Sequence, residues 1–253
     1  MRLDEKVAIV TGGAAGIGRQ LALGLAAEGA KIVVADVNEK AAEQLVQSLR
    51  DDGKEALAVG TDVSSAADVE RMVRETVAHY DRIDILVNNA AIYQRVKAAK
   101  VPVWEMSPEE WNRVLAVNLT GVFLCCRTVL PLMIARGVGK IVNIGSAHAL
   151  AGTKNFAHYV ASKGGVMSLT KALAREAGRY NITVNCLAPG SILSEDSEEP
   201  EVLKFRGAAV AARAIKRIGY PQDLVGAAVF LVSSDSDFVT GQTLVVDGGA
   251  LMR

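Results

Sequence analysis

The chain has 253 residues, 50% of them hydrophobic and 22% charged, which is enough apolar material for one large domain or two small ones. Its 28 basic and 28 acidic residues balance, so the composition gives no charge footprint for nucleic acid or for an anionic membrane. Near the charged N-terminus only Val7 to Val10 are apolar, too few for a signal-peptide core, and we count no apolar run as long enough to cross a bilayer. We therefore expect a cytoplasmic protein.

Short apolar runs rich in Val and Ile alternate with helical patterns along the chain. Strands are predicted at residues 6–10, 31–35, 56–60, 83–88, 140–145, 182–188 and 243–247, buried on both faces because their hydrophobicity does not alternate. Helices are predicted at residues 17–30, 38–53, 64–80, 107–133 and 221–234, with Asn38 and Ser107 as N-caps and Pro108 in the first turn. This order predicts an α/β fold, with one doubly wound, seven-stranded parallel sheet and helices on both faces, in a single domain spanning residues 1–253.

One segment interrupts this rhythm. Residues 191–217 are long, polar at their start and acidic, which is more typical of a flap over a site than of a core element. We expect this segment to lie on the substrate side.

The cysteines and histidines argue against a metal site. Cys125, Cys126 and Cys186 are odd in number and lack metal-like spacing, so we interpret them as buried thiols in a reducing cytosol. A catalytic cysteine is a minor alternative. The histidines also lack ligand-like spacing, and no metal is expected.

The first predicted strand runs directly into a glycine-rich turn, TGGAAGIG, at residues 11–18. Gly12, Gly16 and Gly18 form a variant of the dinucleotide-binding fingerprint, in which glycines permit a tight turn, a close approach to the pyrophosphate and close helix packing. The helix that follows would direct unpaired N–H groups at the phosphates. Because the turn links a strand to a helix, the pattern predicts a dinucleotide site.

An acidic residue ends the second predicted strand at the spacing expected for contact with the adenosine ribose. Asp36 lies 18 residues beyond Gly18, and its carboxylate would repel a 2′-phosphate. The turn itself contains Ala14 and Ala15 and no basic residue, so we predict NAD(H) rather than NADP(H) as coenzyme. The alternative is that Asp36 only caps the next helix. Asp62 is a candidate for the adenine edge, or equally a helix cap.

Further motifs complete a resemblance to a known family. The glycine turn is followed by NNAA at residues 88–91, Asn118, Ser146, YVASK at 159–163 and APG at 188–190. Together they resemble the short-chain dehydrogenase/reductase family over essentially the whole chain. The resemblance implies a Rossmann-type fold and hydride exchange between a nicotinamide and the CH–OH group of a secondary alcohol or the carbonyl of a ketone.

The resemblance also assigns roles to individual residues. Tyr159 would be the general acid/base, and Lys163 would lower the pKa of the Tyr159 phenol and hold the nicotinamide ribose. Ser146 would polarise the substrate oxygen, and Asn118 would hold a water for proton relay. The coenzyme would be held by Gly12, Ala15, Gly16, Ile17, Gly18, Asp36, Val37, Asp62, Val63, Asn89, Ala90, Ala91, Tyr159, Lys163, Pro189, Gly190, Ile192 and Ser194. The family usually has glycine where Ala91 stands, which costs little if the backbone there is ordinary, and Ser194 stands where many members have Thr.

The substrate pocket is expected among the residues least typical of the family. We place Ser146, His148, Asn155, Tyr159 and Tyr93 there. Arg95, Lys97 and Lys100 are interpreted as a solvated basic loop, with contact to an anionic substrate as the alternative.

Three functions remain in competition. A small secondary alcohol, ketone or polyol is favoured as substrate, because the acidic 191–217 segment would repel the charge of an acyl carrier. A 3-oxoacyl-[acyl-carrier-protein] reductase is the first alternative and a non-catalytic nucleotide sensor the second. By analogy with the family, the apolar C-terminus predicts a homotetramer.

Overall fold

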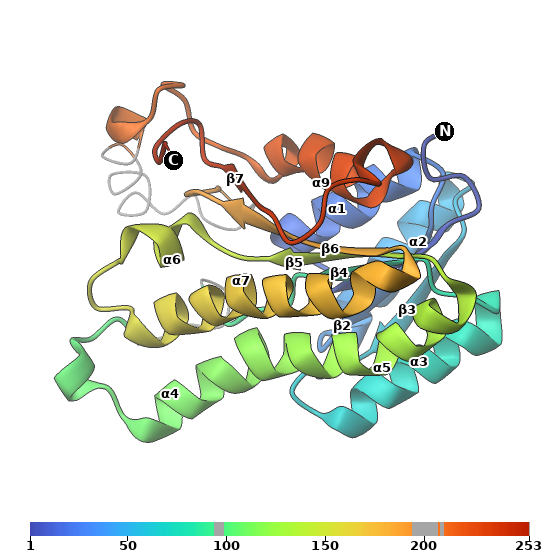
Figure 1. The fold of residues 1–253 in the computed structure, drawn as a ribbon, viewed down its shortest axis with the longest axis horizontal. Coiled ribbons are helices and arrows are strands. Elements are labelled where there is room, and N and C mark those ends of the chain that lie inside the picture. Colours follow the sequence, from blue (N-terminus) through green and yellow to red (C-terminus); the bar gives the residue numbers. More distant parts are fainter. Residues whose placement is uncertain (94–98, 194–206, 208–209, 253) are drawn as a thin grey trace.

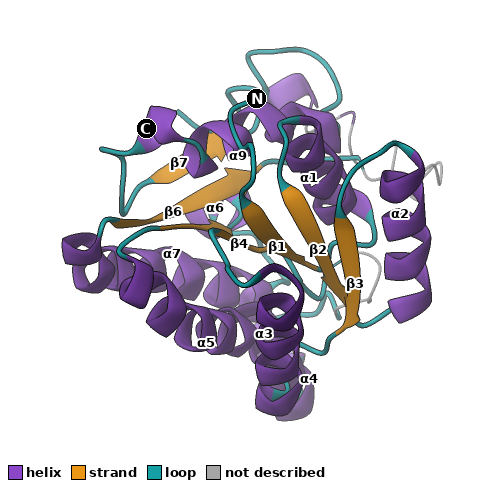
Figure 2. Ribbon diagram, turned by 90° about the vertical axis from the view of Figure 1, so that its right-hand side faces the viewer, coloured by secondary structure: helices purple, strands orange, loops and turns teal. Residues whose placement is uncertain are grey.

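The computed structural model describes residues 1–93, 99–193, 207 and 210–252, and its centre is a parallel sheet (Figures 1 and 2). Within the described residues the sheet has seven strands in the order β3-β2-β1-β4-β5-β6-β7. The strands are β1 (Val7–Thr11), β2 (Lys31–Asp36), β3 (Ala56–Gly60), β4 (Ile85–Asn88), β5 (Gly139–Ile144), β6 (Ile182–Pro189) and β7 (Thr243–Val246). This confirms the predicted fold class, and the predicted strand ends differ from the observed ones by no more than two residues.

Helices cover both faces of the sheet, as Figure 1 shows. One layer contains α1 (Gly16–Ala27), α2 (Glu39–Asp51) and α9 (Val225–Val232), and the other contains α3 (Ala66–Tyr80), α4 (Pro108–Leu115), α5 (Gly121–Arg136) and α7 (Ala157–Ala177). Shorter elements are α6 (Ala147–Ala151), a π-helical turn (Ala116–Thr120) and 3₁₀ turns at Val103–Glu105, Gly178–Tyr180, Pro221–Leu224 and Ser234–Ser236.

Successive residues of a central strand point into different cores. Ala8 and Val10 of β1 pack under α1 and α9, whereas Val7 and Ile9 pack under α3 and α5. Because neighbouring side chains of a strand point to opposite faces, a strand covered on both faces needs an unbroken apolar run. That requirement explains why the continuous runs in the sequence predicted the strands.

The last strand departs from the predicted burial. β7 lies at one edge of the sheet and pairs only with β6 among the described strands. Its residues are half-buried or exposed, and Leu244 is 37% exposed. An apolar run therefore predicted this strand correctly but not its incomplete cover.

Helix starts follow the predicted caps. The side chain of Asn38 accepts a hydrogen bond from the Ala41 amide at the start of α2, and Ser107 accepts one from the Glu110 amide at the start of α4. Pro108 occupies the first turn of α4. By contrast, α1 begins after Ala15 without a side-chain cap.

The elements α4, the π-helical turn and α5 form one continuous helical stretch, Pro108–Arg136. Its 29 residues are long and apolar enough, by length and composition, to cross a bilayer, so the expectation that no run reaches this length was wrong. In this fold the stretch packs against α3 and α7 and against β4 and β5. It is a covering helix of the sheet, with 39% of its most apolar window buried.

A buried carboxylate holds the N-terminal edge of the sheet. Asp84 is 3% exposed, accepts the Val7 amide at 2.9 Å, and pairs with Arg82 at 2.6 Å and with Arg136 at 3.1 Å. Burial alone would raise the pKa of Asp84, but the hydrogen bonds from Arg82 and Val7 lower it overall. The ionised carboxylate therefore joins the start of β1 to the end of α5.

Candidate active site

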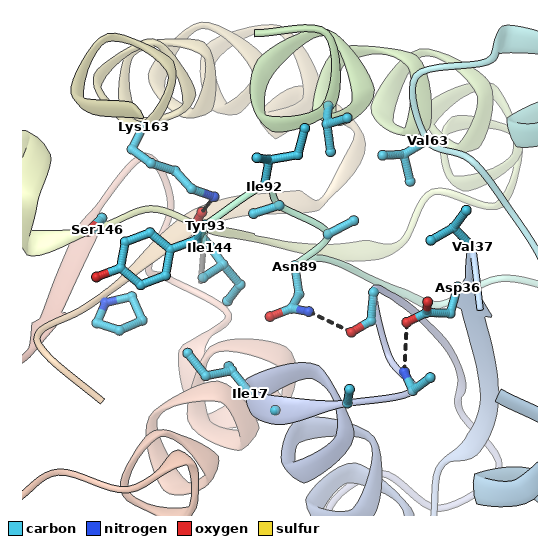
Figure 3. A pocket seen from close by; sticks show the side chains of 18 of the residues that line it. Ile17, Asp36, Val37, Val63, Asn89, Ile92, Tyr93, Ile144, Ser146 and Lys163 are labelled. Atoms are coloured by element: carbon cyan, nitrogen blue, oxygen red, sulfur yellow. Dashed lines mark hydrogen bonds between the residues drawn. The ribbon is translucent and has the colours of Figure 1, made fainter. Parts of the chain in front are cut away.

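A cavity of about 540 Å³ lies at the carboxyl ends of the central strands. From β1 the chain adds β2 and β3 on one side of the sheet, and it then crosses to β4 and adds β5, β6 and β7 on the other side. The strand order therefore reverses between β1 and β4, and the cavity lies there. Doubly wound sheets bind ligands at this position. Figure 3 shows Asp36 and Val37 at one end of the cavity and Ser146, Tyr93 and Lys163 at the other.

Most of the predicted coenzyme residues line this cavity. They are Gly12, Ala15, Gly16, Ile17, Asp36, Val37, Asp62, Val63, Asn89, Ala90, Ala91, Tyr159, Lys163, Pro189, Gly190 and Ile192. Gly18 does not line it, and Ser194 falls outside the described residues.

The glycine turn is shaped by close contacts between main chains. Gly12 has a φ of +59°, and a Cβ there would lie 2.8 Å from the Cα of Ala90. Gly18 lets α1 approach the turn, because a Cβ there would overlap the Gly12 carbonyl oxygen. Asn89 holds the turn by donating from Nδ2 to the carbonyl oxygens of Gly12 at 2.9 Å and Thr11 at 3.0 Å. Since α1 has no side-chain cap, its first N–H groups could bind a phosphate.

Asp36 is held at one end of the cavity by two main-chain amides. Its carboxylate accepts the Ala14 amide at 3.0 Å and the Asn38 amide at 2.9 Å (Figure 3 shows the first). Asn38 caps α2 with its own side chain, so Asp36 does not serve as that helix cap. The next residue, Val37, is 75% exposed and offers no positive charge.

Asp62 lines the cavity beside Val63. It accepts hydrogen bonds from both the amide and the hydroxyl of Ser64, at 2.9 and 2.6 Å. The cap of α3 is Ser65, which accepts the Asp68 amide, so the helix-cap alternative for Asp62 was wrong.

The opposite end of the cavity gathers three polar side chains, one from the junction between β5 and α6 and two from α7. Ser146 follows β5 and caps α6, accepting the His148 amide at 3.2 Å. Tyr159 and Lys163 lie one turn apart in the first half of α7, only 6% and 2% exposed. Lys163 donates from Nζ to the Ile144 carbonyl oxygen at 2.7 Å (Figure 3).

Burial dominates the electrostatics of this cluster. It raises the pKa of the Tyr159 phenol, with a further rise from Tyr93, against a hydrogen bond with Ser146 that lowers it. Burial also lowers the pKa of Lys163 to about 8, with Cys186 opposing the shift. The chain by itself therefore keeps Tyr159 protonated at neutral pH.

Comparison with known proteins decides the family. The model of a family described as enoyl-(acyl carrier protein) reductase matches residues 12–250. The chain belongs to the short-chain dehydrogenase/reductase family. It is accordingly an oxidoreductase acting on CH–OH groups, within the range of alcohol and ketone substrates of that family.

Individual relatives are similar over almost their whole length. A 5-keto-D-gluconate 5-reductase of Escherichia coli is 40% identical over 99% of this chain and 97% of its own. A 3-oxoacyl-[acyl-carrier-protein] reductase of Synechocystis is 38% identical over 99% of this chain and 98% of its own. Among solved structures, a proposed gluconate dehydrogenase from Agrobacterium tumefaciens superimposes with a TM-score of 0.92 at 38% identity, covering 99% of this chain and 98% of that one.

The structure buries the Asn118 side chain away from the cavity in which its predicted role would place a relay water. Asn118 lies in the π-helical turn, is fully buried and does not line the cavity. Its side chain accepts the Ile92 amide at 2.7 Å and donates to the Ile92 carbonyl oxygen at 3.2 Å and to Ser162 at 3.3 Å. Because these hydrogen bonds occupy its side chain, Asn118 could hold a relay water only through its main chain. The π-helical turn changes the hydrogen bonding of that main chain.

The predicted substrate pocket is only partly assembled. Tyr93 and His148 line the cavity near Ser146 and Tyr159, whereas Asn155 does not. Asn155 is exposed, with a φ of +60°, in the turn before α7 begins. Its placement in the pocket was wrong, because it is exposed in this turn and does not face the cavity.

Sequence reasoning missed several residues of the dehydrogenase site. Phe156 is buried and stacks on Tyr159 with ring centroids 4.7 Å apart. Ile92 and Val117, adjacent in sequence to Tyr93 and Asn118, line the cavity, as do Ile144 and Gly145 at the end of β5. Their only sequence cue was adjacency to the motifs.

Other expectations concern charge, metals and thiols. Lys100 is exposed, with Nζ 5.6 Å from the Phe156 ring centroid, whereas Arg95, Lys97 and most of the 191–217 segment lie outside the described residues. Ala91 does not have a positive φ, so the methyl group that it adds relative to glycine costs little.

No cluster that could hold a metal occurs among the described residues. The three cysteines are free and buried, and burial raises the pKa of each.

Proposed function

We propose that the chain is an NAD(H)-dependent dehydrogenase/reductase of small polar secondary alcohols and ketones, with Tyr159 as general acid/base. The observation that carries the proposal is that Ser146, Tyr159 and Lys163 converge at one end of a cavity whose other end presents the Asp36 carboxylate. The glycine turn, with its close approach to Ala90 and the uncapped start of α1, fits a dinucleotide pyrophosphate. The bound nicotinamide supplies the hydride chemistry.

The chain's own residues would move the proton and orient the substrate oxygen. In ketone reduction, Ser146 donates a hydrogen bond to the carbonyl oxygen and Tyr159 delivers the proton to it. The raised pKa of Tyr159 keeps that proton in place until it is needed. In alcohol oxidation the phenol must first lose its proton, which positive charge at Lys163 favours. Lys163 would also hold the nicotinamide ribose hydroxyls.

Tyr159→Phe tests the assignment of the general acid/base. The substitution removes one hydroxyl and retains the ring that stacks on Phe156. NADH binding, measured by fluorescence titration, should be retained, while turnover of any accepted alcohol or ketone falls by at least about a thousandfold, within the range of general acid–base contributions. Substantial residual turnover would show that Tyr159 was wrongly assigned.

The preference for NAD(H) rests on the charges at the adenosine end. A 2′-phosphate would meet the Asp36 carboxylate and the apolar Val37, and Lys163, at the other end, is the lone lysine or arginine among the described lining residues. Comparing kcat/KM for NADH and NADPH tests this, and a clear preference for NADPH would refute it. Asp36→Ser should reduce the preference for NADH over NADPH, because it removes the repulsion between the carboxylate and the 2′-phosphate.

A 3-oxoacyl-[acyl-carrier-protein] reductase is the second candidate. A relative with that activity is 38% identical, nearly as similar as the 5-keto-D-gluconate 5-reductase at 40%. Acetoacetyl-coenzyme A assayed beside small hydroxyketones distinguishes the two. A strong preference for the acyl thioester would replace the favoured substrate class. NADH binding without turnover of any alcohol, ketone or thioester would instead support a nucleotide sensor.

A cytoplasmic homotetramer completes the proposal. The free buried thiols fit a reducing compartment. Apolar side chains are exposed on α5, where Phe123 is 46% exposed, and at the β7 edge, where Leu244 is 37% exposed. Such surfaces suit subunit contacts. Light scattering that gave the mass of a single chain would refute the tetramer.

A further inference from the structure

One wall of the cavity presents two polar groups that the proton-transfer cluster does not use. Tyr93 and His148 line the cavity together with Ser146 and Tyr159. The Tyr93 hydroxyl and the His148 Nε2 are 3.5 Å apart, at the outer limit of a hydrogen bond. The Tyr93 and Tyr159 ring centroids are 4.9 Å apart, and those of His148 and Tyr159 are 6.4 Å apart. Both polar groups are therefore close neighbours of the proton donor.

Each of the two side chains is also held by contacts other than the one between the Tyr93 hydroxyl and His148 Nε2. His148 contacts the Thr153 hydroxyl through Nδ1 at 2.7 Å, and its main-chain amide donates to Ser146. Tyr93 follows Ile92, whose amide and carbonyl are both bound by the Asn118 side chain, and its ring packs on Phe156. Nε2 and the phenolic hydroxyl are thus preorganised at the cavity wall rather than mobile.

Both groups can donate and accept hydrogen bonds. A phenol does so through one oxygen, and a neutral imidazole does so through its two nitrogens. Burial lowers the pKa of His148, and the charge of Lys100 lowers it further, so the imidazole is neutral near pH 7. A neutral donor–acceptor pair suits a hydroxyl, which accepts from one group and donates to the other, better than it suits a carboxylate.

We infer that Tyr93 and His148 bind a second hydroxyl of the substrate, on the carbon next to the reacting one, so that the preferred substrates are vicinal diols and α-hydroxyketones. The inference rests on the proposed function, because it takes Ser146 and Tyr159 to hold the reacting oxygen. It makes Tyr93 and His148 specificity-determining residues. A monofunctional alcohol would forgo the two hydrogen bonds that a second hydroxyl can make with this pair, which makes it the weaker substrate.

Substrate pairs that differ by one hydroxyl test the inference. In the wild type, kcat/KM for butane-2,3-diol should exceed that for butan-2-ol, and 3-hydroxybutan-2-one should be preferred over butan-2-one. Tyr93→Phe should lower this diol preference about tenfold, the fold-change expected for one neutral hydrogen bond. The kcat/KM for butan-2-ol should change much less than that for butane-2,3-diol, because the variant retains Ser146 and Tyr159, which take the reacting oxygen.

A matched pair of substitutions examines the histidine. An asparagine amide can replace the Nδ1 contact with Thr153 but does not reach the Nε2 position, whereas a glutamine amide reaches it. His148→Asn should therefore lose the diol preference about tenfold, and His148→Gln should retain most of it. Tyr80→Phe, on α3 and outside the cavity lining, serves as the control and should leave both substrates unchanged.

Three results would overturn the inference. One is a wild type that turns over both members of each pair equally well, in which case the proposed function stands and the second-hydroxyl site does not. Another is a parallel loss of kcat/KM for both substrates in Tyr93→Phe and His148→Asn, which would indicate a structural role. A wild type that oxidises or reduces no member of either pair would refute the proposed substrate class, and this site with it.

Discussion

Replacing Gly18 by alanine should damage coenzyme binding although Gly18 does not line the cavity. The added Cβ would overlap the Gly12 carbonyl oxygen and lie 2.5 Å from Asn89 Nδ2. These are the two atoms of the 2.9 Å hydrogen bond that holds the glycine turn. Neither the main chain of Gly12 nor the packed amide of Asn89 can withdraw cheaply, so α1 and the turn must separate.

The magnitude follows from two contributions. Overpacking of a close main-chain contact costs about 1–3 kcal/mol, and loss of the Asn89–Gly12 hydrogen bond costs about 1 kcal/mol. A total of about 2–4 kcal/mol should lower Tm by about 4–16 °C in a chain of this size. Displacement of the turn should also raise the Kd for NADH at least about tenfold, which corresponds to about 1.4 kcal/mol.

Thermal unfolding and fluorescence titration with NADH measure the two effects. The matched control is Gly226→Ala, because Gly226 lies in α9 and a Cβ there meets nothing within 4 Å. The control should be as stable as the wild type or more stable by about 0.5 kcal/mol. If Gly18→Ala had the wild-type Tm and Kd, close approach of α1 to the turn would not be what requires glycine.

Three further outcomes are expected. Asp84→Asn should lose about 2 kcal/mol of unfolding free energy at pH 7 relative to the exposed control Asp52→Asn, measured by urea denaturation. Because the pKa of Asp84 is lowered in the folded state, its ionised form stabilises the fold above about pH 4, and this stabilisation is lost as the pH falls through the folded-state pKa. The Asp84→Asn variant should therefore lose less stability than the wild type on acidification. An equal loss would contradict this. Gly24→Ala would drive a Cβ into the Val225 side chain, costing about 1–3 kcal/mol, and Val225→Ala added to it should recover part of the Tm; no recovery would contradict the contact. The three buried thiols should react with a disulfide reagent only on unfolding, and rapid labelling of native protein would show that one is accessible.

The sequence predicted those features of the fold and site that depend on local geometry. Gly12 and Gly16 have positive φ values, which glycine tolerates, and the strand–turn–helix order fixes where they lie. Asp36 was placed correctly because it ends a strand next to β1. Each of these features depends on a few consecutive residues or on the strand order.

Features that depend on distant contacts were not predicted. The Asn118 side chain binds Ile92, 26 residues earlier, and no local pattern indicates that contact. Asn155 was misplaced because it lies exposed in the turn before α7, which begins only at Ala157. The exposure of Leu244 depends on the position of β7 at the sheet edge, which an apolar run does not reveal.

The hydrogen bonds between the Asn118 side chain and Ile92 separate the fixed core of the molecule from the segment that follows Ile92. Both main-chain groups of Ile92 are fixed to a buried amide, so whatever follows Ile92 departs from a defined point and direction. The chain is fixed again at Ser107, which caps α4. A segment between these two anchors could be replaced with one from a relative of different substrate preference while Ser146, Tyr159 and Lys163 keep their places. New substrate ranges on this scaffold could then arise through insertions and substitutions in this loop without repacking of the core.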